Sequence, residues 1–343
     1  MTVLVCDDGC QDFLAQEIKR RWLQPAPQLR TERAVIVESD ALPSSSLMFV
    51  RQALPAATKL SLPSISAWAK SISDPTIELF RDETPWRLHL AALYGEGKAG
   101  QNRLRLIQDA VIEQLKKRRR ARLKSLTISD TPFTEPEGLV QLVLTAPDEG
   151  FLSIMPPPAP AAHRHLVSPF LLGEIPVSED KSAPSRAFAK LVEAQKRLGR
   201  AIQPGETVID LGASPGGWTY VAVNQGARVT SIDRSPLRPD LMAHPRVTFI
   251  KGDAFAHEPT SQVDWIVCDV IAAPERSIDL LLNLAKKAKM KHFAFSIKFQ
   301  GDQDYHQVDK LAEQLPQLCS TFLLTRLSAN KNEACAVGSL KEG

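Results

Sequence analysis

One segment, residues 207–223, constrains the fold of this 343-residue chain more than any other. It begins with β-forming residues and an acid, Asp210, and ends in apolar residues that can begin a helix. Between them, Gly212, Gly216 and Gly217 let the backbone turn sharply and approach a ligand closely. The pattern predicts a parallel strand, a glycine turn and a helix of an α/β domain, with a ligand at the carboxyl end of the strand. The spacing Gly-x-x-x-Gly-Gly differs from Gly-x-Gly-x-x-Gly and disfavours a dinucleotide.

Three further predicted strands also lead into carboxylates. Asp233 follows residues 227–232, Asp253 follows residues 247–250, and Asp269 follows residues 263–268. The carboxyl ends of parallel strands share one edge of a sheet, so these acids are expected to converge there. Aspartate also caps helices and turns after strands, an alternative that explains one such acid better than it explains all of them together.

Four motifs in the carboxyl half resemble those of the FtsJ-like class of ribose 2′-O-methyltransferases. They are the glycine loop, residues 185–193 (Ser-Arg-Ala-Phe-Ala-Lys-Leu-Val-Glu), residues 296–301 (Ser-Ile-Lys-Phe-Gln-Gly) and residues 328–337 (Ser-Ala-Asn-Lys-Asn-Glu-Ala-Cys-Ala-Val). The resemblance implies a Rossmann-like domain that takes its methyl group from S-adenosylmethionine.

The resemblance assigns the catalytic tetrad of this class to Lys190, Asp269, Lys298 and Glu333. A ribose 2′-hydroxyl is a weak nucleophile that must lose its proton as it attacks, so a base is needed. A lysine can act as that base if burial and a neighbouring cation lower its pKa. We therefore expect Lys298 to be the base and Lys190 the second cation. Asp269 would position Lys298 and the donor, and Glu333 would orient the lysine or the ribose.

The resemblance also implies a set of donor-binding residues, in which Asp233 binds the ribose hydroxyls and Asp253 faces the adenine amine. The set is Ser185, Asp210, Gly212, Ser214, Pro215, Gly216, Gly217, Trp218, Asp233, Asp253 and Asp269. The leaving group of the reaction is a neutral thioether, so no metal ion is predicted.

The amino half contains a basic run that predicts contact with RNA. Apolar residues at helical spacing over residues 102–115 are followed by seven cations within nine residues. These are Lys116, Lys117, Arg118, Arg119, Arg120, Arg122 and Lys124. A solvated helix end, whose cations complement the helix dipole, is the alternative, but seven charges exceed what that role needs.

The domain organisation follows from these patterns and from a proline-rich segment. We expect a small α+β element at residues 1–75, a ferredoxin-like or THUMP-like RNA-binding domain at 76–155, a linker at 156–164 and the Rossmann-like domain at 165–343. The linker is placed where residues 156–160 (Pro-Pro-Pro-Ala-Pro) disfavour a helix or an inner strand. Strand-like residues 86–90, 138–145 and 150–155 around the basic helix carry the weak THUMP resemblance.

The apolar runs, the first residues and the cysteines indicate where the protein is located. No apolar run is long enough for a membrane helix, the first residues lack a basic leader, and the five cysteines are scattered. The sequence therefore predicts a cytoplasmic protein with reduced thiols and no membrane association.

The combination of a small amino-terminal element, a THUMP-like domain and the tetrad is similar to the bacterial 23S ribosomal RNA cytidine 2′-O-methyltransferases. That resemblance implies methylation of a cytidine in protein-free or partly assembled 23S ribosomal RNA. Two alternatives stay open: the same chemistry on a tRNA or an mRNA cap, and a non-catalytic RNA-binding or ribosome-assembly factor. The nucleotide and the oligomeric state do not follow from the sequence.

Overall fold

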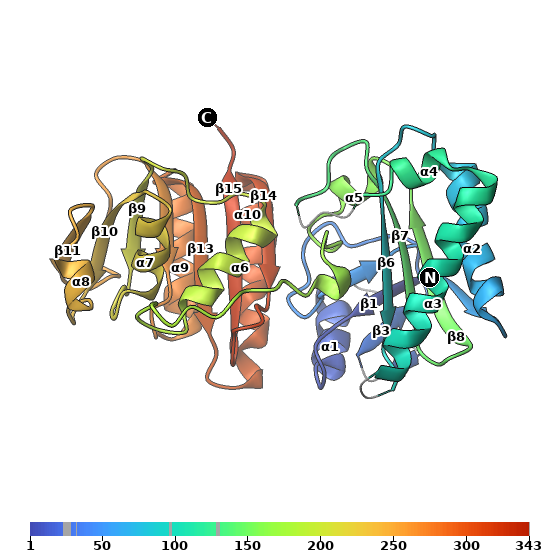
Figure 1. The fold of residues 1–343 in the computed structure, drawn as a ribbon. Helices are drawn as coiled ribbons and strands as arrows, with labels where there is room; N and C mark the ends of the chain where they lie inside the picture. The colour runs from blue at the N-terminus through green and yellow to red at the C-terminus, as the bar shows by residue number, and fades with distance from the viewer. Residues whose placement is uncertain (23–28, 32, 96–97, 128–130, 343) are drawn as a thin grey trace. The chain divides into compact units, whose positions relative to one another are not determined.

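The computed structural model describes residues 1–22, 29–31, 33–95, 98–127 and 131–342. The chain divides into two compact units, an N-terminal unit Met1–Glu174 and a C-terminal unit Ile175–Gly343 (Figure 1). Within the described ranges, each helix is too short or too polar to cross a membrane. All five cysteines are buried and form no disulfide.

The C-terminal unit is built on a seven-stranded sheet in the order β11-β10-β9-β12-β13-β15-β14. Its strands are β9 (Thr207–Leu211), β10 (Arg228–Asp233), β11 (Val247–Lys251), β12 (Val263–Cys268), β13 (Met290–Lys298), β14 (Cys319–Thr325) and β15 (Glu333–Leu340). Strands β9 to β13 are parallel, and β15 pairs antiparallel with both β13 and β14. The predicted α/β class and Rossmann-like arrangement are therefore confirmed for this unit.

Helices connect the parallel strands and bury their apolar faces on the sheet. They are α6 (Phe188–Leu198), α7 (Gly217–Asn224), α8 (Pro239–Met242), α9 (Pro274–Lys286) and α10 (Asp309–Leu318), the last preceded by the 3₁₀ turn η2 (Asp302–Val308). Helix α6 packs with α7, and α9 packs with α10 (Figure 1). A core that includes Leu191, Val208 and Trp265 joins α6 and α7 to the central strands. This packing holds the carboxyl ends of β9, β10 and β12 at one edge of the sheet, as predicted from their acids.

The N-terminal unit contains two four-stranded sheets, ordered β2-β3-β1-β4 and β5-β8-β7-β6. The first consists of β1 (Thr2–Val5), β2 (Leu29–Thr31), β3 (Ala34–Val37) and β4 (Gln52–Leu54), and the second of β5 (Thr58–Ser61), β6 (Trp86–Ala92), β7 (Gly138–Leu144) and β8 (Glu149–Met155). The helices are α1 (Gln11–Arg21), α2 (Ile65–Leu79), α3 (Lys98–Arg118), α4 (Ala121–Lys124) and α5 (Ala159–Ala162), with a 3₁₀ turn η1 (Leu171–Gly173). The helix expected from residue 11 to about residue 23 ends at Arg21, and residue 23 lies outside the described residues.

The predicted boundaries within this unit need correction. A boundary after residue 75 would cut α2, and it would remove β5, which pairs with β8 in the second sheet. The two sheets also share one apolar core, which includes Val3, Phe151 and Ala91. The segment 1–75 is therefore not a separate element of the fold.

The topology of the second sheet and the start of the C-terminal unit also differ from expectation. The order β5-α2-β6-α3-β7-β8, with β6 and β7 parallel, is not the β-α-β-β-α-β order of a ferredoxin-like fold. The proline-rich residues expected to be a linker include the short helix α5, because proline fits the first turn of a helix. The N-terminal unit continues to Glu174, so the C-terminal unit begins at Ile175 and not near residue 165.

Candidate active site and donor cavity

Two lysines and two carboxylates form a closed network at the carboxyl edge of the sheet. Lys298 Nζ lies 2.6 Å from Asp269 Oδ1 and 2.7 Å from Glu333 Oε2. Lys190 Nζ lies 2.6 Å from Glu333 Oε1 and 3.2 Å from Asp269 Oδ1. Each carboxylate thus contacts both ammonium groups, and the predicted tetrad is brought together from four segments that lie far apart in the sequence.

The backbone explains why these side chains meet. Lys298 and Glu333 are directly opposite each other in the antiparallel pair of β13 and β15. Asp269 follows β12, the parallel neighbour of β13 on its other side. Lys190 reaches the same edge from the first turn of α6. Only Lys298 and Asp269 line the adjoining cavity, whereas Lys190 and Glu333 have side chains that are 9% and 5% exposed. Of the two lysines, Lys298 is therefore the one placed to meet a reacting group.

The pKa of Lys298 corrects one part of the sequence prediction. Burial lowers this pKa, but the charges of Asp269 and Glu333 and their hydrogen bonds raise it more, so the net pKa lies above the ordinary value. The predicted lowering of this pKa by burial and a neighbouring cation is wrong for this structure, because the two carboxylates stabilise the charged form. To act as a base, Lys298 must first pass a proton to one of its two carboxylate partners or to water.

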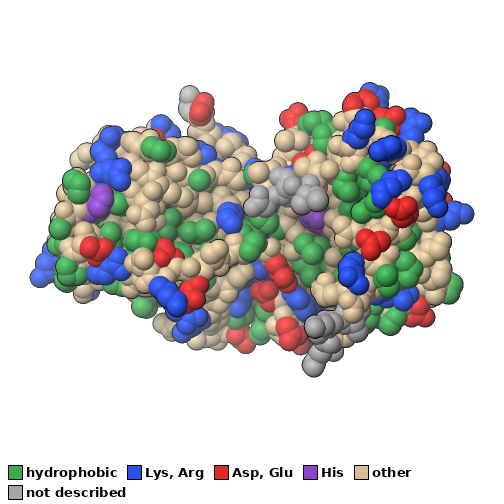
Figure 2. All heavy atoms as spheres, in the orientation of Figure 1, with side chains coloured by type: hydrophobic (Ala, Val, Ile, Leu, Met, Phe, Trp, Pro, Cys, Tyr) green, Lys and Arg blue, Asp and Glu red, His purple; other side chains and the backbone are tan. Residues whose placement is uncertain are grey.

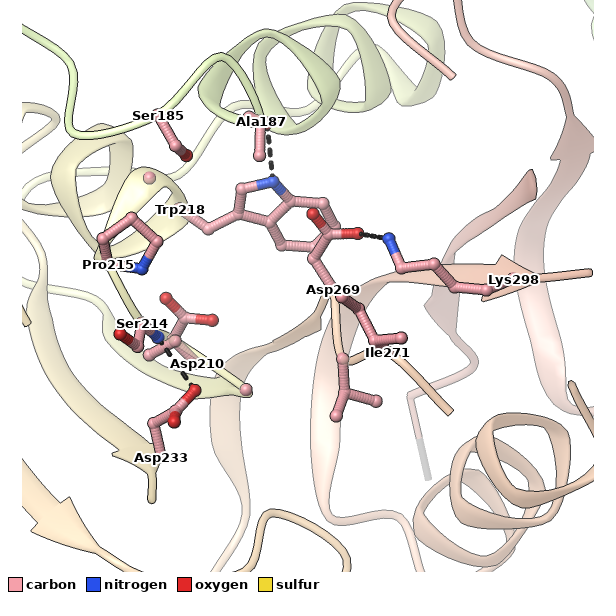
Figure 3. Close-up of a pocket in the computed structure, with 14 residues that line it drawn as sticks. Ser185, Ala187, Asp210, Ser214, Pro215, Trp218, Asp233, Asp269, Ile271 and Lys298 are labelled. Carbon is pink, nitrogen blue, oxygen red and sulfur yellow. Dashed lines mark hydrogen bonds and ion pairs between the residues drawn. The ribbon is translucent and has the colours of Figure 1, made fainter. Parts of the chain in front are cut away.

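A cavity of about 410 Å³ adjoins the tetrad (Figure 3). Its lining includes nine of the predicted donor-binding residues: Ser185, Asp210, Gly212, Ser214, Pro215, Gly217, Trp218, Asp233 and Asp269. Figure 3 shows Asp233 on one side of this cavity and Asp269 with Lys298 on the other. The cavity therefore extends from the carboxyl end of β10 to the tetrad.

Two glycines of this loop lie where neighbouring protein atoms leave no room for a side chain. A Cβ on Gly212, which has φ +77°, would lie 2.9 Å from Val270 Cβ, and one on Gly217 would lie 2.5 Å from Ser185 Oγ. Gly216 does not line the cavity; it is the N-cap residue of α7, and a Cβ there would lie 2.4 Å from Leu241 of α8. Its contact with the donor stays a prediction, and its φ of +111° is the reason for glycine at this position.

The acids at the strand ends hold the loops of this cavity. Asp233 accepts hydrogen bonds from Ser214 N at 3.0 Å and Ser235 N at 2.8 Å. Asp253 lines a second cavity of about 220 Å³ that also includes Gly212 and Asp233. A hydrogen bond from Phe255 N and an ion pair with Arg234 hold the pKa of Asp253 below its usual value. Asp253 thus stays charged near the region where the resemblance places adenosine.

Asp210 differs from these acids because it is buried in the strand. Burial raises the pKa of its carboxyl group to about 7, although Thr219 donates a hydrogen bond to Oδ2 at 2.7 Å. Neighbouring Asp269 and Asp233 raise it further by charge repulsion. Asp210 ties β9 to the first turn of α7, and thereby fixes the glycine loop between them.

Several lining residues were not predicted. Ala187, Ala213, Val270 and Ile271 line the first cavity, and Arg234, Ala254, Phe255 and Arg276 line the second. All but Ala187 and Arg276 lie on loops that follow β9, β10, β11 or β12. The rule that ligands lie beyond the carboxyl ends of parallel strands could have found these six loop residues, since each follows an acid that the sequence analysis singled out.

The basic run of the N-terminal unit divides into paired and unpaired cations. Lys116 pairs with Glu113, Arg118 with Asp74, and Arg119 with Asp82. Arg122 has a side chain that is 3% exposed, so its predicted direct contact with RNA is wrong in this structure. Lys117, Arg120 and Lys124 are exposed and have no ion pair among the described residues.

These pairings follow from the packing of the N-terminal helices. Helix α3 lies against α2, and Asp74 belongs to α2 while Asp82 follows it. Figure 2 accordingly shows acidic side chains interspersed with the basic ones over this part of the N-terminal unit. A run that is continuous in the sequence is therefore partly neutralised by acids from another helix.

Comparison with known proteins agrees with the site. Residues 183–316 match the FtsJ-like methyltransferase family, so this part of the chain is an FtsJ-like methyltransferase domain. The predicted class of the domain and its methyl donor, S-adenosylmethionine, are confirmed by this match. The matched span includes Lys190, Asp269 and Lys298, whereas Glu333 lies beyond it.

Relatives of known name are similar over part of the chain. A "Ribosomal RNA large subunit methyltransferase M" of Thauera aminoaromatica is 37% identical over 138 residues, which are 38% of this chain and 38% of that protein. The protein of the same name from Azoarcus sp. (strain BH72) is 32% identical over 197 residues, 53% of this chain and 54% of its own length. The matched region thus spans about half the length of these relatives or less.

A solved structure, a putative hemolysin from Lactococcus lactis, is 21% identical with a TM-score of 0.40, over 48% of this chain and 91% of its own. A likeness of this size supports no conclusion about function.

Proposed function

We propose that this chain transfers a methyl group from S-adenosylmethionine to a ribose 2′-hydroxyl of RNA, and that its substrate is a cytidine of 23S ribosomal RNA before the ribosome is assembled. The observation that carries the proposal is the network of Lys190, Asp269, Lys298 and Glu333 beside the donor cavity. The names of the relatives support a large-subunit ribosomal RNA as the substrate.

The residues of the chain fit the donor by charge and by space. The cavity has a volume of about 410 Å³, and it is lined by Gly212 and Gly217, where an added Cβ would meet Val270 and Ser185. Asp233 would bind the ribose hydroxyls, and Asp253 would face the adenine amine in the second cavity. The donor supplies a methyl group on a positively charged sulfur, and that charge would lower the pKa of a nearby ammonium group.

Lys298 would first give up its own proton and then accept the proton of the attacking hydroxyl. In the resting network its Nζ donates to Asp269 and Glu333, so it is charged. Transfer of that proton to Asp269 or Glu333, along contacts of 2.6 and 2.7 Å, would leave a neutral amine facing the cavity. Lys190 contacts the same two carboxylates, and its positive charge would offset their negative charge while the proton moves. The geometry thus provides both the base and a place for its proton.

The N-terminal unit would bind the RNA through exposed cations. Lys117, Arg120 and Lys124 are the members of the basic run that are free for phosphate contacts among the described residues. Aromatic side chains are scarce near the run, which favours recognition of backbone and shape over base stacking. The THUMP-like interpretation of this region remains a prediction. The cytoplasmic location of the protein also remains a prediction.

The deciding experiment is to map 2′-O-methyl groups on RNA from cells with and without the gene. Loss of one methyl group from a cytidine of 23S ribosomal RNA supports the proposal. Loss from a tRNA or a cap would keep the chemistry and change the substrate. Unchanged methylation together with RNA binding by the purified protein would favour a non-catalytic factor.

A further inference from the structure

One wall of the donor cavity is a segment without helix or strand, residues 180–187, called the donor strap from here on. Ser185 and Ala187 of the strap line the cavity. Ser185 lies against the glycine loop, which is why a Cβ on Gly217 would come within 2.5 Å of its Oγ. Lys181, Ser182 and Arg186 are exposed. The donor strap therefore has one side toward the cavity and the other toward water.

Three side chains tether the donor strap, and they differ in burial. Trp218, which is buried, donates from Nε1 to Ala187 O at 2.8 Å. Tyr220 donates from its hydroxyl to Asp180 Oδ2 at 2.9 Å, and Arg238 donates from Nη1 to Ser182 O at 2.7 Å. Trp218 belongs to the core of the unit, so the Ala187 end is fixed. The tethers at the other end, from Tyr220 and Arg238, are polar and lie near the surface.

Arg238 connects the donor strap to the other walls of the cavity. Its backbone N donates to Pro215 O of the glycine loop at 3.0 Å. Asp240 accepts from Nε at 2.5 Å and from Nη2 at 2.7 Å, which orients the guanidinium and leaves Nη1 for Ser182. The side chains of Arg238 and Asp240 are 34% and 55% exposed. Contacts of this kind are weak because water and salt screen them, so they can open without disturbing the core.

From this arrangement we propose that the donor strap is a latched wall of the donor cavity, and that Tyr220 and Arg238 are positioning residues that set how long the donor stays bound. When the latch is closed, Ser185 is held against Gly217 and the cavity. When the two surface contacts break, the strap pivots about Ala187 and the donor or its product can leave. The identity of the donor rests on the proposed function; the latch itself rests on the tethers.

The test measures dissociation of S-adenosylhomocysteine from the full-length protein by rapid mixing with excess S-adenosylmethionine. Tyr220→Phe removes one hydroxyl and keeps the ring, and Arg238→Gln removes the contact to Ser182. Each is expected to raise the dissociation rate about 2- to 10-fold, the effect of losing one hydrogen bond. The double variant should exceed either single one. Lys287→Gln is the matched control, because it breaks an exposed ion pair with Glu258 that lies outside the strap and the cavity lining.

Unchanged dissociation in both single variants and in the double variant would overturn the proposal, as would an equal increase in the Lys287→Gln control. Trypsin provides a second readout that needs no ligand, since Lys181 and Arg186 are exposed cleavage sites within the donor strap. The two strap variants should be cut there faster than the wild type. If the wild type binds no donor at all, the proposed function fails, while equal cutting of wild type and variants would overturn the latch.

Discussion

The charged residues of the two units are arranged in opposite ways. In the C-terminal unit, Lys190, Asp269, Lys298 and Glu333 are far apart in the sequence and meet within hydrogen-bonding distance. In the N-terminal unit, seven cations that are neighbours in the sequence separate into paired, buried and exposed groups. A motif whose residue types serve one reaction, at spacings set by one fold, therefore predicts a site better than a local concentration of one charge.

The largest effect is expected at Lys298, and its absence would mean that the tetrad is only structural. Lys298→Ala should lower the rate of methyl transfer about 100- to 10,000-fold, because general base catalysis is lost. Lys298→Arg should fail nearly as completely, since a guanidinium does not release its proton near neutral pH. Single-turnover transfer to protein-free ribosomal RNA measures both. Lys291→Ala is the control, a lysine of the same strand that pairs with Asp264 away from the cavity.

The pH dependence of the wild-type rate tests the same residue. A base must be neutral to accept a proton, and the pKa of Lys298 is raised above 10.5 by Asp269 and Glu333 despite burial. If the Lys298 proton leaves to water, the rate should rise with pH, about tenfold per unit, throughout the range in which the protein is stable. If it moves to Asp269 or Glu333, the network keeps the proton, and the rate should be independent of pH while Lys298→Arg stays inactive. A plateau near neutral pH would show that the bound donor lowers this pKa strongly. A rate independent of pH, with an active Lys298→Arg variant, would show that the lysine is only a fixed charge.

The next largest effect concerns stability and Asp210. Its pKa is about 7 in the folded protein against 3.8 ordinarily, so the folded state holds a proton that the unfolded chain has released. The free energy of unfolding should fall as pH rises from about 4 to about 7, by up to about 4 kcal/mol. Urea unfolding of wild type and Asp210→Asn between pH 4 and 8 should show this slope only in the wild type.

Asp264 provides a control of opposite sign for that experiment. Although burial raises the pKa of its carboxyl group, Lys291 and Thr207 lower it to about 2. Its contribution to stability is therefore present above pH 4 and is lost only in stronger acid. Asp264→Asn should lower stability by the same amount at each pH from 5 to 8. A wild-type stability that does not fall over this range would contradict the raised pKa of Asp210.

The sequence predicted the C-terminal unit well because each motif there carries its own physical reason. The strand before Asp210, the glycine turn and the acids at strand ends specify a parallel sheet with a ligand at one edge. The pKa of Lys298 could not be predicted, because it depends on how close Asp269 and Glu333 come. The N-terminal boundaries failed for a related reason: pairing of β5 with β8 joins residues 58–61 to residues 149–152, and no local pattern records it.

A smaller effect is expected at Asp233, and it tests whether this carboxylate binds the donor. Asp233→Ala should weaken binding of S-adenosylmethionine by about 1.5 to 3 kcal/mol, the contribution of hydrogen bonds to a charged group. Calorimetry measures this directly. Because Asp233 also holds Ser214 N and Ser235 N, Asp233→Asn is the matched variant that keeps one acceptor oxygen. It should lose less affinity than the alanine variant, and unchanged affinity in both would remove Asp233 from the donor site.

The smallest effect is expected in the basic run of the N-terminal unit. Changing Lys117, Arg120 and Lys124 to serine removes three exposed cations, whereas changing Lys116, Arg118 and Arg119 removes three cations that already have acidic partners. Both triple variants lose the same formal charge. The first should lower the salt dependence of RNA binding by up to about three units of slope, because each phosphate contact contributes about 0.9. The second should lower it less, since Glu113, Asp74 and Asp82 compete with phosphate for those cations.

Titration of ribosomal RNA fragments at several salt concentrations distinguishes the two triple variants. Equal losses would mean that total charge matters and pairing does not. If neither variant changes affinity or slope, the run is a solvated helix end, and the RNA must be bound elsewhere.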